Sequence, residues 1–254
     1  MPAPLPLSIQ LYTLRDRIQE KGFLNVLREL SFIGLPYVEF AGFHGLSPAS
    51  VKRILDDEGL KASSAHVPVF APAKWNEIED EAKRVGYKHV IAGFGADDFK
   101  TEDAVKAAAE KANTAVNHFR SRDLIVSYHN HEWEFTDPDK AALFFDLCPH
   151  LGLQIDIYWV QTANQNPAEW IRRYARRTHL LHIKDGPADP KNRNAPMTAA
   201  GKGRVPIADC VRAAENTGVE FLALELDQCE TDMLSAVREC TQFMIRHGLG
   251  SGRI

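Results

Sequence analysis

Four side chains that can bind metal ions lie near the ends of short apolar segments in the second half of this sequence. His129, Asp156, His182 and Glu225 each follow or close a run rich in Val, Ile and Leu. Together they offer two imidazoles and two carboxylates. Such a mixed nitrogen and oxygen set suits Mn²⁺, Co²⁺, Zn²⁺ or Fe²⁺ better than Mg²⁺ or Ca²⁺, which prefer shells of oxygen alone.

The alternation of side chains along a strand predicts that these four residues point into one interior. Successive strand residues face opposite sides, and apolar neighbours such as Tyr128 and Ile155 occupy the other side. Burying an isolated carboxylate costs many kcal/mol. The four side chains therefore either surround a divalent cation or satisfy one another through hydrogen bonds without metal. Because all four occupy matching positions, we favour the metal site.

The framework that positions them is an alternation of short β-rich segments and longer helical patterns, at about 30 residues per unit. The predicted strands span 7–12, 37–40, 61–66, 89–92, 124–131, 153–157, 178–184 and 221–226, and the predicted helices span 19–32, 47–59, 75–85, 101–120, 137–148, 167–176, 207–217 and 231–247. Strand-then-helix alternation implies parallel strands with right-handed crossovers. Eight units predict an α/β protein with a single (β/α)₈ barrel domain over residues 1–254, close to the usual length of about 250 residues.

Composition excludes several other classes of protein. The chain has 254 residues, a formal charge of −4 and 44% hydrophobic residues. It has no basic excess of the kind that nucleic-acid binding needs and no apolar run of the ~20 residues that span a bilayer. Its four cysteines form no C-x-x-C pair, which indicates thiols in a reducing cytoplasm. We expect a cytoplasmic protein that binds neither nucleic acid nor membrane. The apolar Phe144-Phe145 pair is compatible with a homodimer, and equally with helix packing.

The sequence resembles the xylose isomerase-like TIM-barrel superfamily, the sugar phosphate isomerase/epimerase group. The resemblance covers nearly the whole chain. Its most specific segment is the fifth-strand motif Y-H-N-H-E-W-E-F, residues 128–135. The other segments that carry it are I-Q-L-Y-T-L-R at 9–15, S-A-H at 64–66, D-I-Y-W at 156–159, H-I-K-D at 182–185 and G-K-G at 201–203.

The resemblance implies a metal site and a shared chemistry. In the ketose epimerases of this superfamily, Glu, Asp, His and Glu hold the metal and the two Glu residues move the proton. Asp156, His182 and Glu225 match three of these positions, whereas His129 stands where those epimerases have Glu. The Y-H-N-H motif is more similar to putative sugar isomerases, inosose dehydratases, 3-dehydroshikimate dehydratases and enzymes of 3-keto-sugars. These activities share proton abstraction beside a carbonyl through a metal-stabilised enediolate.

We therefore predict an isomerase or epimerase that acts on a small carbohydrate, a keto-sugar or related polyol, with one divalent metal ion. Mn²⁺ is the favoured metal, with Co²⁺, Zn²⁺, Fe²⁺ or Mg²⁺ as alternatives. A lyase that dehydrates a keto-sugar or keto-cyclitol is the main alternative, because His129 replaces Glu and His131 is an additional histidine.

Four residues are candidates for catalysis, each beside a structural alternative. Glu225 can act as the base while it binds metal, and His131 is the next acid or base candidate or else orients a ligand. Lys184 binds a substrate hydroxyl or stabilises the enolate, or forms a salt bridge to Glu225 or Glu39. Glu134 is an acid or base, or a structural ion pair.

Other residues are candidates for substrate binding. Glu39 and His66 are expected to bind sugar hydroxyls, and Trp159, Tyr12 and Phe94 to form an apolar wall against the sugar. The long loop 186–205 carries Arg193, Lys202 and Arg204, which either grip a phosphate or are solvated loop charges. A phosphorylated substrate is therefore not predicted.

Two further classes are less compatible with the sequence. The chemistry of DNA-repair enzymes of the endonuclease IV type looks like that of a three-metal site with about nine His and carboxylate ligands. In this chain six of the ten histidines lie off the predicted ligand positions. A catalytically inactive scaffold barrel would not need four convergent ligands.

Overall fold

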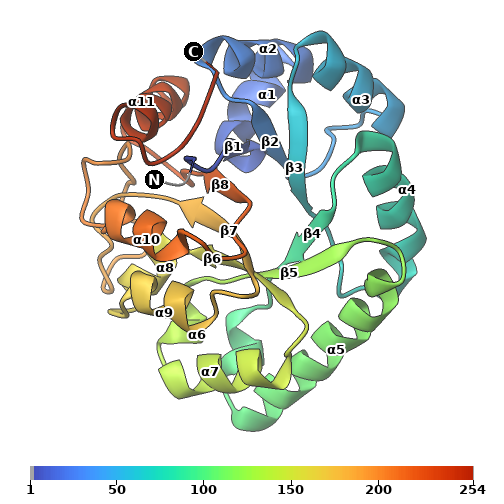
Figure 1. Ribbon diagram of the computed structural model, residues 1–254, viewed down its shortest axis with the longest axis vertical. Coiled ribbons are helices and arrows are strands. Elements are labelled where there is room, and N and C mark those ends of the chain that lie inside the picture. Colours follow the sequence, from blue (N-terminus) through green and yellow to red (C-terminus); the bar gives the residue numbers. More distant parts are fainter. Residues whose placement is uncertain (1–2, 254) are drawn as a thin grey trace.

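Eight parallel strands close into a barrel in the computed structural model, which describes residues 3–253 (Figure 1). Each strand pairs with the next along the chain, and β1 pairs with β8. This arrangement confirms the predicted (β/α)₈ barrel. The strands are β1 (Leu7–Gln10), β2 (Tyr37–Phe40), β3 (Lys61–His66), β4 (His89–Ala92), β5 (Ile125–His129), β6 (Gly152–Asp156), β7 (Thr178–Ile183) and β8 (Phe221–Leu224).

The helices form a ring around this barrel (Figure 1). Several begin where the sequence places a capping residue before proline: Ser47 caps the helix that starts at Pro48, and Asp137 caps the helix that starts at Pro138. Within residues 3–253 the α-helices are α1 (Arg15–Lys21), α2 (Phe23–Ile33), α3 (Pro48–Asp57), α4 (Trp75–Val85), α5 (Glu102–Arg120), α6 (Glu132–Phe135), α7 (Pro138–Leu147), α8 (Ile157–Thr162), α9 (Pro167–Arg173), α10 (Ile207–Ala214) and α11 (Met233–Arg246). Three short 3₁₀ turns, η1 (Leu11–Leu14), η2 (Pro72–Lys74) and η3 (Ala96–Phe99), complete the set.

The structure corrects the predicted number and limits of these elements. The single helix predicted over 19–32 is two helices, because Gly22 adopts a φ of +85° between α1 and α2. Two helices that were not predicted, α6 and α8, follow β5 and β6: α8 begins at the residue after β6, and α6 begins after a turn of two residues. Asp156 begins α8 by accepting hydrogen bonds from the backbone N–H groups of Tyr158 and Trp159 at 3.0 and 3.1 Å.

Three strands also end two residues earlier than predicted. β1 ends at Gln10, β5 at His129 and β8 at Leu224. Tyr12 therefore lies in η1, and His131 lies in the turn that begins α6 instead of above His129 on the strand. Glu225 is the first residue after β8.

Packing divides the barrel into an apolar outer layer and a polar interior. Tyr128 faces outward and packs against Phe144 of α7, with ring centroids 4.7 Å apart. Inside, the hydroxyls of Ser8 and Ser63 are hydrogen-bonded at 2.8 Å. The two ends of the described chain meet beside β1, where Leu7 N–H donates to the Ser251 carbonyl at 2.9 Å.

Two composition-based expectations can be compared with this fold. All four cysteines are free thiols within residues 3–253, and Cys229 is the one that is not fully buried. None of the helices in that range combines the length and apolarity needed to cross a bilayer.

Candidate active site

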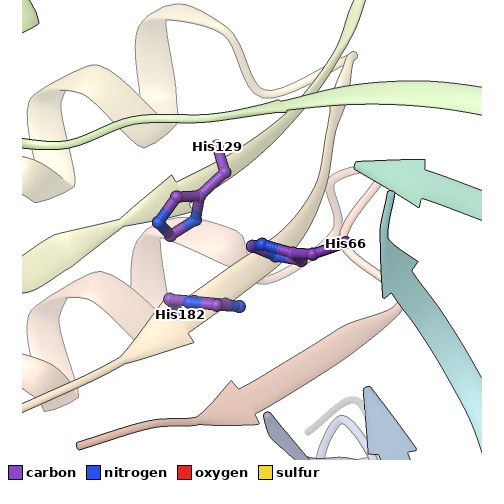
Figure 2. Close-up of side chains that lie close together, drawn as sticks. All are labelled: His66, His129 and His182. Carbon is purple, nitrogen blue, oxygen red and sulfur yellow. The ribbon is translucent and has the colours of Figure 1, made fainter. Parts of the chain in front are cut away.

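The four predicted metal ligands converge at the carboxyl ends of β5, β6, β7 and β8. One donor atom from each of His129, Asp156, His182 and Glu225 lies within 4.8 Å of those from the other three, and all four side chains are buried. His66, on β3, forms a second group with the ligand candidates His129 and His182, in which the three donor nitrogens also lie within 4.8 Å of one another. Figure 2 shows the three imidazoles pointing toward one another from β3, β5 and β7.

His182 lies between two carboxylates. Its Nδ1 is 2.7 Å from Oε2 of Glu225, and its Nε2 is 2.6 Å from Oε1 of Glu39. Burial alone would lower the pKa of His182, but attraction to Glu39 and Glu225 raises it to about 10. Without a metal ion, His182 therefore carries a positive charge between two negative ones.

Lys184 supplies a second buried positive charge. Its Nζ lies 2.7 Å from Oε2 of Glu225, 3.2 Å from Oδ2 of Asp156 and 3.1 Å from Oδ1 of Asp227. The salt bridge considered between Lys184 and Glu225 is therefore present. Asp227 was not predicted as a site residue. It follows Glu225 by two positions, so the parity rule applied to Glu225 would also have marked it.

Glu39 lies beneath the cavity, and neighbouring side chains are hydrogen-bonded to both of its carboxylate oxygens. Besides His182, the side chains of Gln10 and His66 lie 2.7 and 3.1 Å from its Oε1, and Gln154 lies 2.6 Å from its Oε2, where the Ser64 hydroxyl also donates. Burial alone would raise the pKa of Glu39, but His182 and His66 lower it well below its usual value.

This position corrects the expectation that Glu39 binds a sugar hydroxyl. Glu39 is not among the residues that line the cavity, and its oxygens are already occupied by protein donors. Its role in the structure is to hold other site residues in place.

A cavity of about 860 Å³ opens above the ligand cluster at this end of the barrel. Seven of the predicted site residues besides His129 line it, and so do several residues for which no role was predicted. The lining includes Tyr12, His66, Phe94, His129, His131, Trp133, Trp159, Lys184, Arg193, Met197, Glu225 and Asp227.

His131 forms part of an aromatic wall. Its ring stacks on Trp133 with a centroid distance of 4.2 Å, and its Nδ1 has no hydrogen-bond partner among the described residues. Burial lowers the pKa of His131 to about 3, and the positive charge of Lys184 adds to this effect. His131 is therefore neutral at pH 7.

Only one of the three basic loop residues reaches the cavity. The guanidinium carbon of Arg193 lies 5.4 Å from the Trp133 ring centroid and 5.3 Å from that of Trp159. Lys202 and Arg204 line a separate hollow of about 440 Å³ between the loops after β7 and β8, where Lys202 pairs with Glu239. The three basic residues therefore do not form one phosphate-binding cluster.

Glu134 is turned away from the cavity. Its Oε1 accepts a hydrogen bond from the Tyr128 hydroxyl at 2.7 Å, and its Oε2 accepts one from the His131 backbone N–H at 2.9 Å. Burial raises the pKa of Glu134 to about 8. This geometry corrects the expectation of an acid or base in contact with substrate: Glu134 orients the turn that carries His131.

The long loop 186–205 is organised by one buried carboxylate. The two oxygens of Asp185 accept hydrogen bonds from the backbone N–H groups of Gly186, Val205, Gly201 and Gly203, at 2.8 to 3.1 Å. A Cβ atom at Gly203 would lie 2.1 Å from Oδ1 of Asp185, so the loop requires glycine there. This contact explains the second glycine of the G-K-G segment.

The residues of the cluster fit a divalent cation. Oδ2 of Asp156 is buried and accepts no hydrogen bond from residues 3–253, although Lys184 lies nearby. A buried carboxylate oxygen without a hydrogen bond is costly unless a cation lies close to it, and in the metal-free protein Lys184 supplies that charge from 3.2 Å. With two imidazoles and a second carboxylate around it, the set is one that binds first-row transition metals.

Comparison with solved structures shows the same fold at low sequence identity. A sugar phosphate isomerase/epimerase from Parabacteroides distasonis is 20% identical with a TM-score of 0.77, covering 96% of this chain and 94% of the other. The probable 3-DHS dehydratase AsbF from Bacillus anthracis is 12% identical with a TM-score of 0.73, covering 95% and 99%. The IOLI protein, solved with a bound zinc atom, is 13% identical with a TM-score of 0.76, covering 96% and 98%.

The family assignment rests on a match of a different kind. No curated protein matches this sequence. The model of the xylose isomerase-like TIM barrel family matches residues 27–242, which is most of the chain and includes all four residues of the ligand cluster. The chain belongs to the xylose isomerase-like TIM barrel family.

Proposed function

We propose that this protein is a divalent-metal-dependent isomerase or epimerase that moves a proton next to a carbonyl of a keto-sugar or related polyol. The observation that carries the proposal is the convergence of His129, Asp156, His182 and Glu225 within 4.8 Å at the base of an 860 Å³ cavity. Mn²⁺ remains the favoured metal, and the zinc atom of the IOLI structure supports zinc as an alternative.

The proposed roles follow from the contacts of each side chain. His129, Asp156, His182 and Glu225 would hold the metal. When bound, the metal supplies Lewis-acid stabilisation of the negative charge that develops on the substrate oxygen. Oε2 of Glu225 is engaged by His182 and Lys184, whereas no donor among residues 3–253 is hydrogen-bonded to its Oε1. Because Glu225 lines the cavity, Oε1 is the oxygen that can accept a proton from the substrate carbon.

Lys184 and His131 complete the proposed machinery. Lys184 keeps Glu225 ionised: burial alone would raise the pKa of Glu225, but Lys184 and His182 lower it below its usual value. His131 is neutral and its ring lines the cavity, so its imidazole can exchange a proton with a substrate hydroxyl. His66, Tyr12 and Trp159 would contact the sugar.

A dehydratase is the second candidate, and a specific observation favours it. A neutral His131 beside Glu225 offers two proton-transfer groups of different chemistry, which elimination of water requires. The similarity in fold to a probable 3-DHS dehydratase supports the same possibility.

Metal analysis tests the central proposal. We expect wild-type protein, stripped with EDTA and reconstituted with Mn²⁺, to hold one metal ion per chain, and His182→Ala and Glu225→Ala to lose most of it. A wild-type protein that retains no stoichiometric Mn²⁺, Zn²⁺ or Co²⁺ would contradict the proposal. Incubation of the loaded enzyme with ketoses and keto-inositols in D₂O then separates the reactions: carbon–hydrogen exchange without loss of water indicates the isomerase, and loss of water indicates the dehydratase.

A further inference from the structure

Gln154 connects His129 and His66 to Glu39. It is fully buried on β6, two residues before Asp156. Its Oε1 lies 3.0 Å from Nδ1 of His129 and 2.8 Å from Nε2 of His66, and its Nε2 lies 2.6 Å from Oε2 of Glu39. One amide group therefore touches a metal-ligand candidate on one side and the buried carboxylate on the other.

The surroundings determine which end of this amide is oxygen. An ionised carboxylate can only accept hydrogen bonds, so the Gln154 atom that faces Glu39 is the NH₂ group. Gln10 faces Glu39 in the same way, because its own oxygen accepts the backbone N–H of Tyr12 at 3.1 Å and its NH₂ group is left to donate. The remaining atom of the Gln154 amide is its carbonyl oxygen, which needs donors.

The oxygen of Gln154 in turn determines the tautomer of His129. Nδ1 of His129 must carry the proton in order to donate to that oxygen, which leaves the lone pair on Nε2. Nε2 is the nitrogen that faces the ligand cluster, 4.0 Å from Oδ2 of Asp156. Glu39 acts in the same sense on His182: it accepts from Nε2 and so keeps a proton there. Nδ1, which donates to Glu225 at 2.7 Å in the metal-free protein and lies 3.9 Å from Asp156, is then the nitrogen that would give up its proton to a metal ion.

We propose that Glu39 and Gln154 form a tautomer lock that presents Nε2 of His129 and Nδ1 of His182 to the metal. The proposal rests on the proposed metal-dependent function. It also explains why a histidine can stand at position 129. A carboxylate offers two equivalent oxygens to a metal, whereas a neutral imidazole offers one lone pair, and the wrong tautomer points an N–H group at the cation. Glu39 and Gln154 are positioning residues, since neither contacts the cavity.

The test compares Gln154→Met with Gln10→Met. Both variants remove an amide that donates to Glu39, but of these two amides only that of Gln154 touches His129. Metal-free protein labelled with ¹⁵N-histidine is studied by long-range ¹H–¹⁵N correlation spectroscopy, which distinguishes the two tautomers of His129. Dissociation constants for Mn²⁺ and Zn²⁺ are then measured by competition with a fluorescent chelator, and the visible spectrum of the Co²⁺-loaded protein reports the ligand geometry.

We expect a single Nδ1–H tautomer of His129 in the wild type and in Gln10→Met, and a mixture in Gln154→Met. Loss of such an orienting partner typically weakens metal binding by about 10–100-fold, so we expect that loss for Gln154→Met and a smaller one for Gln10→Met. A mixed or Nε2–H tautomer in the wild type overturns the lock even if Gln154→Met fails to fold. An unchanged tautomer in a folded Gln154→Met also overturns it.

The two proposals fail in different ways. A wild type with one tautomer and no stoichiometric metal contradicts the proposed function and leaves the hydrogen-bond lock in place. A wild type that binds metal with mixed tautomers contradicts the lock alone.

Discussion

Nζ of Lys184 lies 2.7 Å from Oε2 of Glu225, the same oxygen that lies 2.7 Å from Nδ1 of His182. Two buried cationic groups thus converge on one carboxylate oxygen of the proposed metal cluster. Attraction to the surrounding carboxylates raises the pKa of Lys184 well above its usual value, although burial opposes this shift. In the metal-free protein, Lys184 provides much of the positive charge that Asp156, Glu225 and Asp227 require.

Replacing Lys184 should therefore make folding depend on metal. Removal of one partner from a buried ion pair costs about 3–5 kcal/mol because the other charge is left uncompensated. We expect Lys184→Met to lower the free energy of unfolding by that amount in EDTA, and saturating Mn²⁺ or Zn²⁺ to recover more stability in the variant than in the wild type. Urea unfolding with and without metal measures both effects.

Lys202→Met is the control for this experiment. Lys202 forms an exposed pair with Glu239, and exposed pairs contribute about 0–1 kcal/mol. Its unfolding should be nearly unchanged in both conditions. Equal destabilisation of the two variants would show that the buried charge network is not what Lys184 supports.

Glu134 should make stability depend on pH. Burial raises its pKa in the folded protein from 4.5 to about 8. The stability associated with its protonated form is fully present below pH 4.5 and is lost as the pH rises through 8, because the unfolded chain ionises first. Relative to Glu134→Gln, the wild type should lose up to about 1.4 kcal/mol of unfolding free energy per pH unit within this window.

Denaturant unfolding of both proteins at intervals from pH 5 to pH 7.5 measures this difference. Parallel curves for the wild type and Glu134→Gln would contradict the raised pKa. Because Gln retains hydrogen-bonding groups for Tyr128 and His131, the comparison isolates the charge.

Gly203 should be essential for the order of the loop after β7. A Cβ atom there would meet Oδ1 of Asp185 at 2.1 Å and the backbone nitrogen of Gly186 at 2.3 Å. We expect Gly203→Ala to be destabilised by roughly 1–3 kcal/mol, the usual cost of overpacking, and to be cleaved faster by trypsin at Lys191 or Arg193. Gly95→Ala is the control, because its Cβ would meet only Asp98, at 3.8 Å, and the φ there is −83°. Similar trypsin sensitivity in both variants would contradict this account.

Much of the fold and the ligand cluster could be predicted because both follow from local periodicity. Apolar runs alternating with helical patterns specify parallel strands, and the period of two along each strand sends His129, Asp156 and His182 to one interior. The predicted limits were less accurate where a side chain hydrogen-bonds to the following backbone. The carboxylate of Asp156 begins a helix at once, and that of Glu134 holds the turn after β5.

The sequence by itself determined the closed barrel and the polar residues that face its axis. Only the tertiary structure decided which of them touch. Glu39 and His182 are 143 positions apart, and their 2.6 Å contact depends on the register of strands on different sides of the barrel. The same register places Gln154 against His129. The folded loops decide the rest: hydrogen bonds to Tyr128 and His131 turn Glu134 away from the cavity, and the path of the loop after β7 separates Arg193 from Lys202 and Arg204. The physical reason is that backbone alternation assigns a side chain to a face, whereas its partner depends on how eight strands are staggered when the sheet closes.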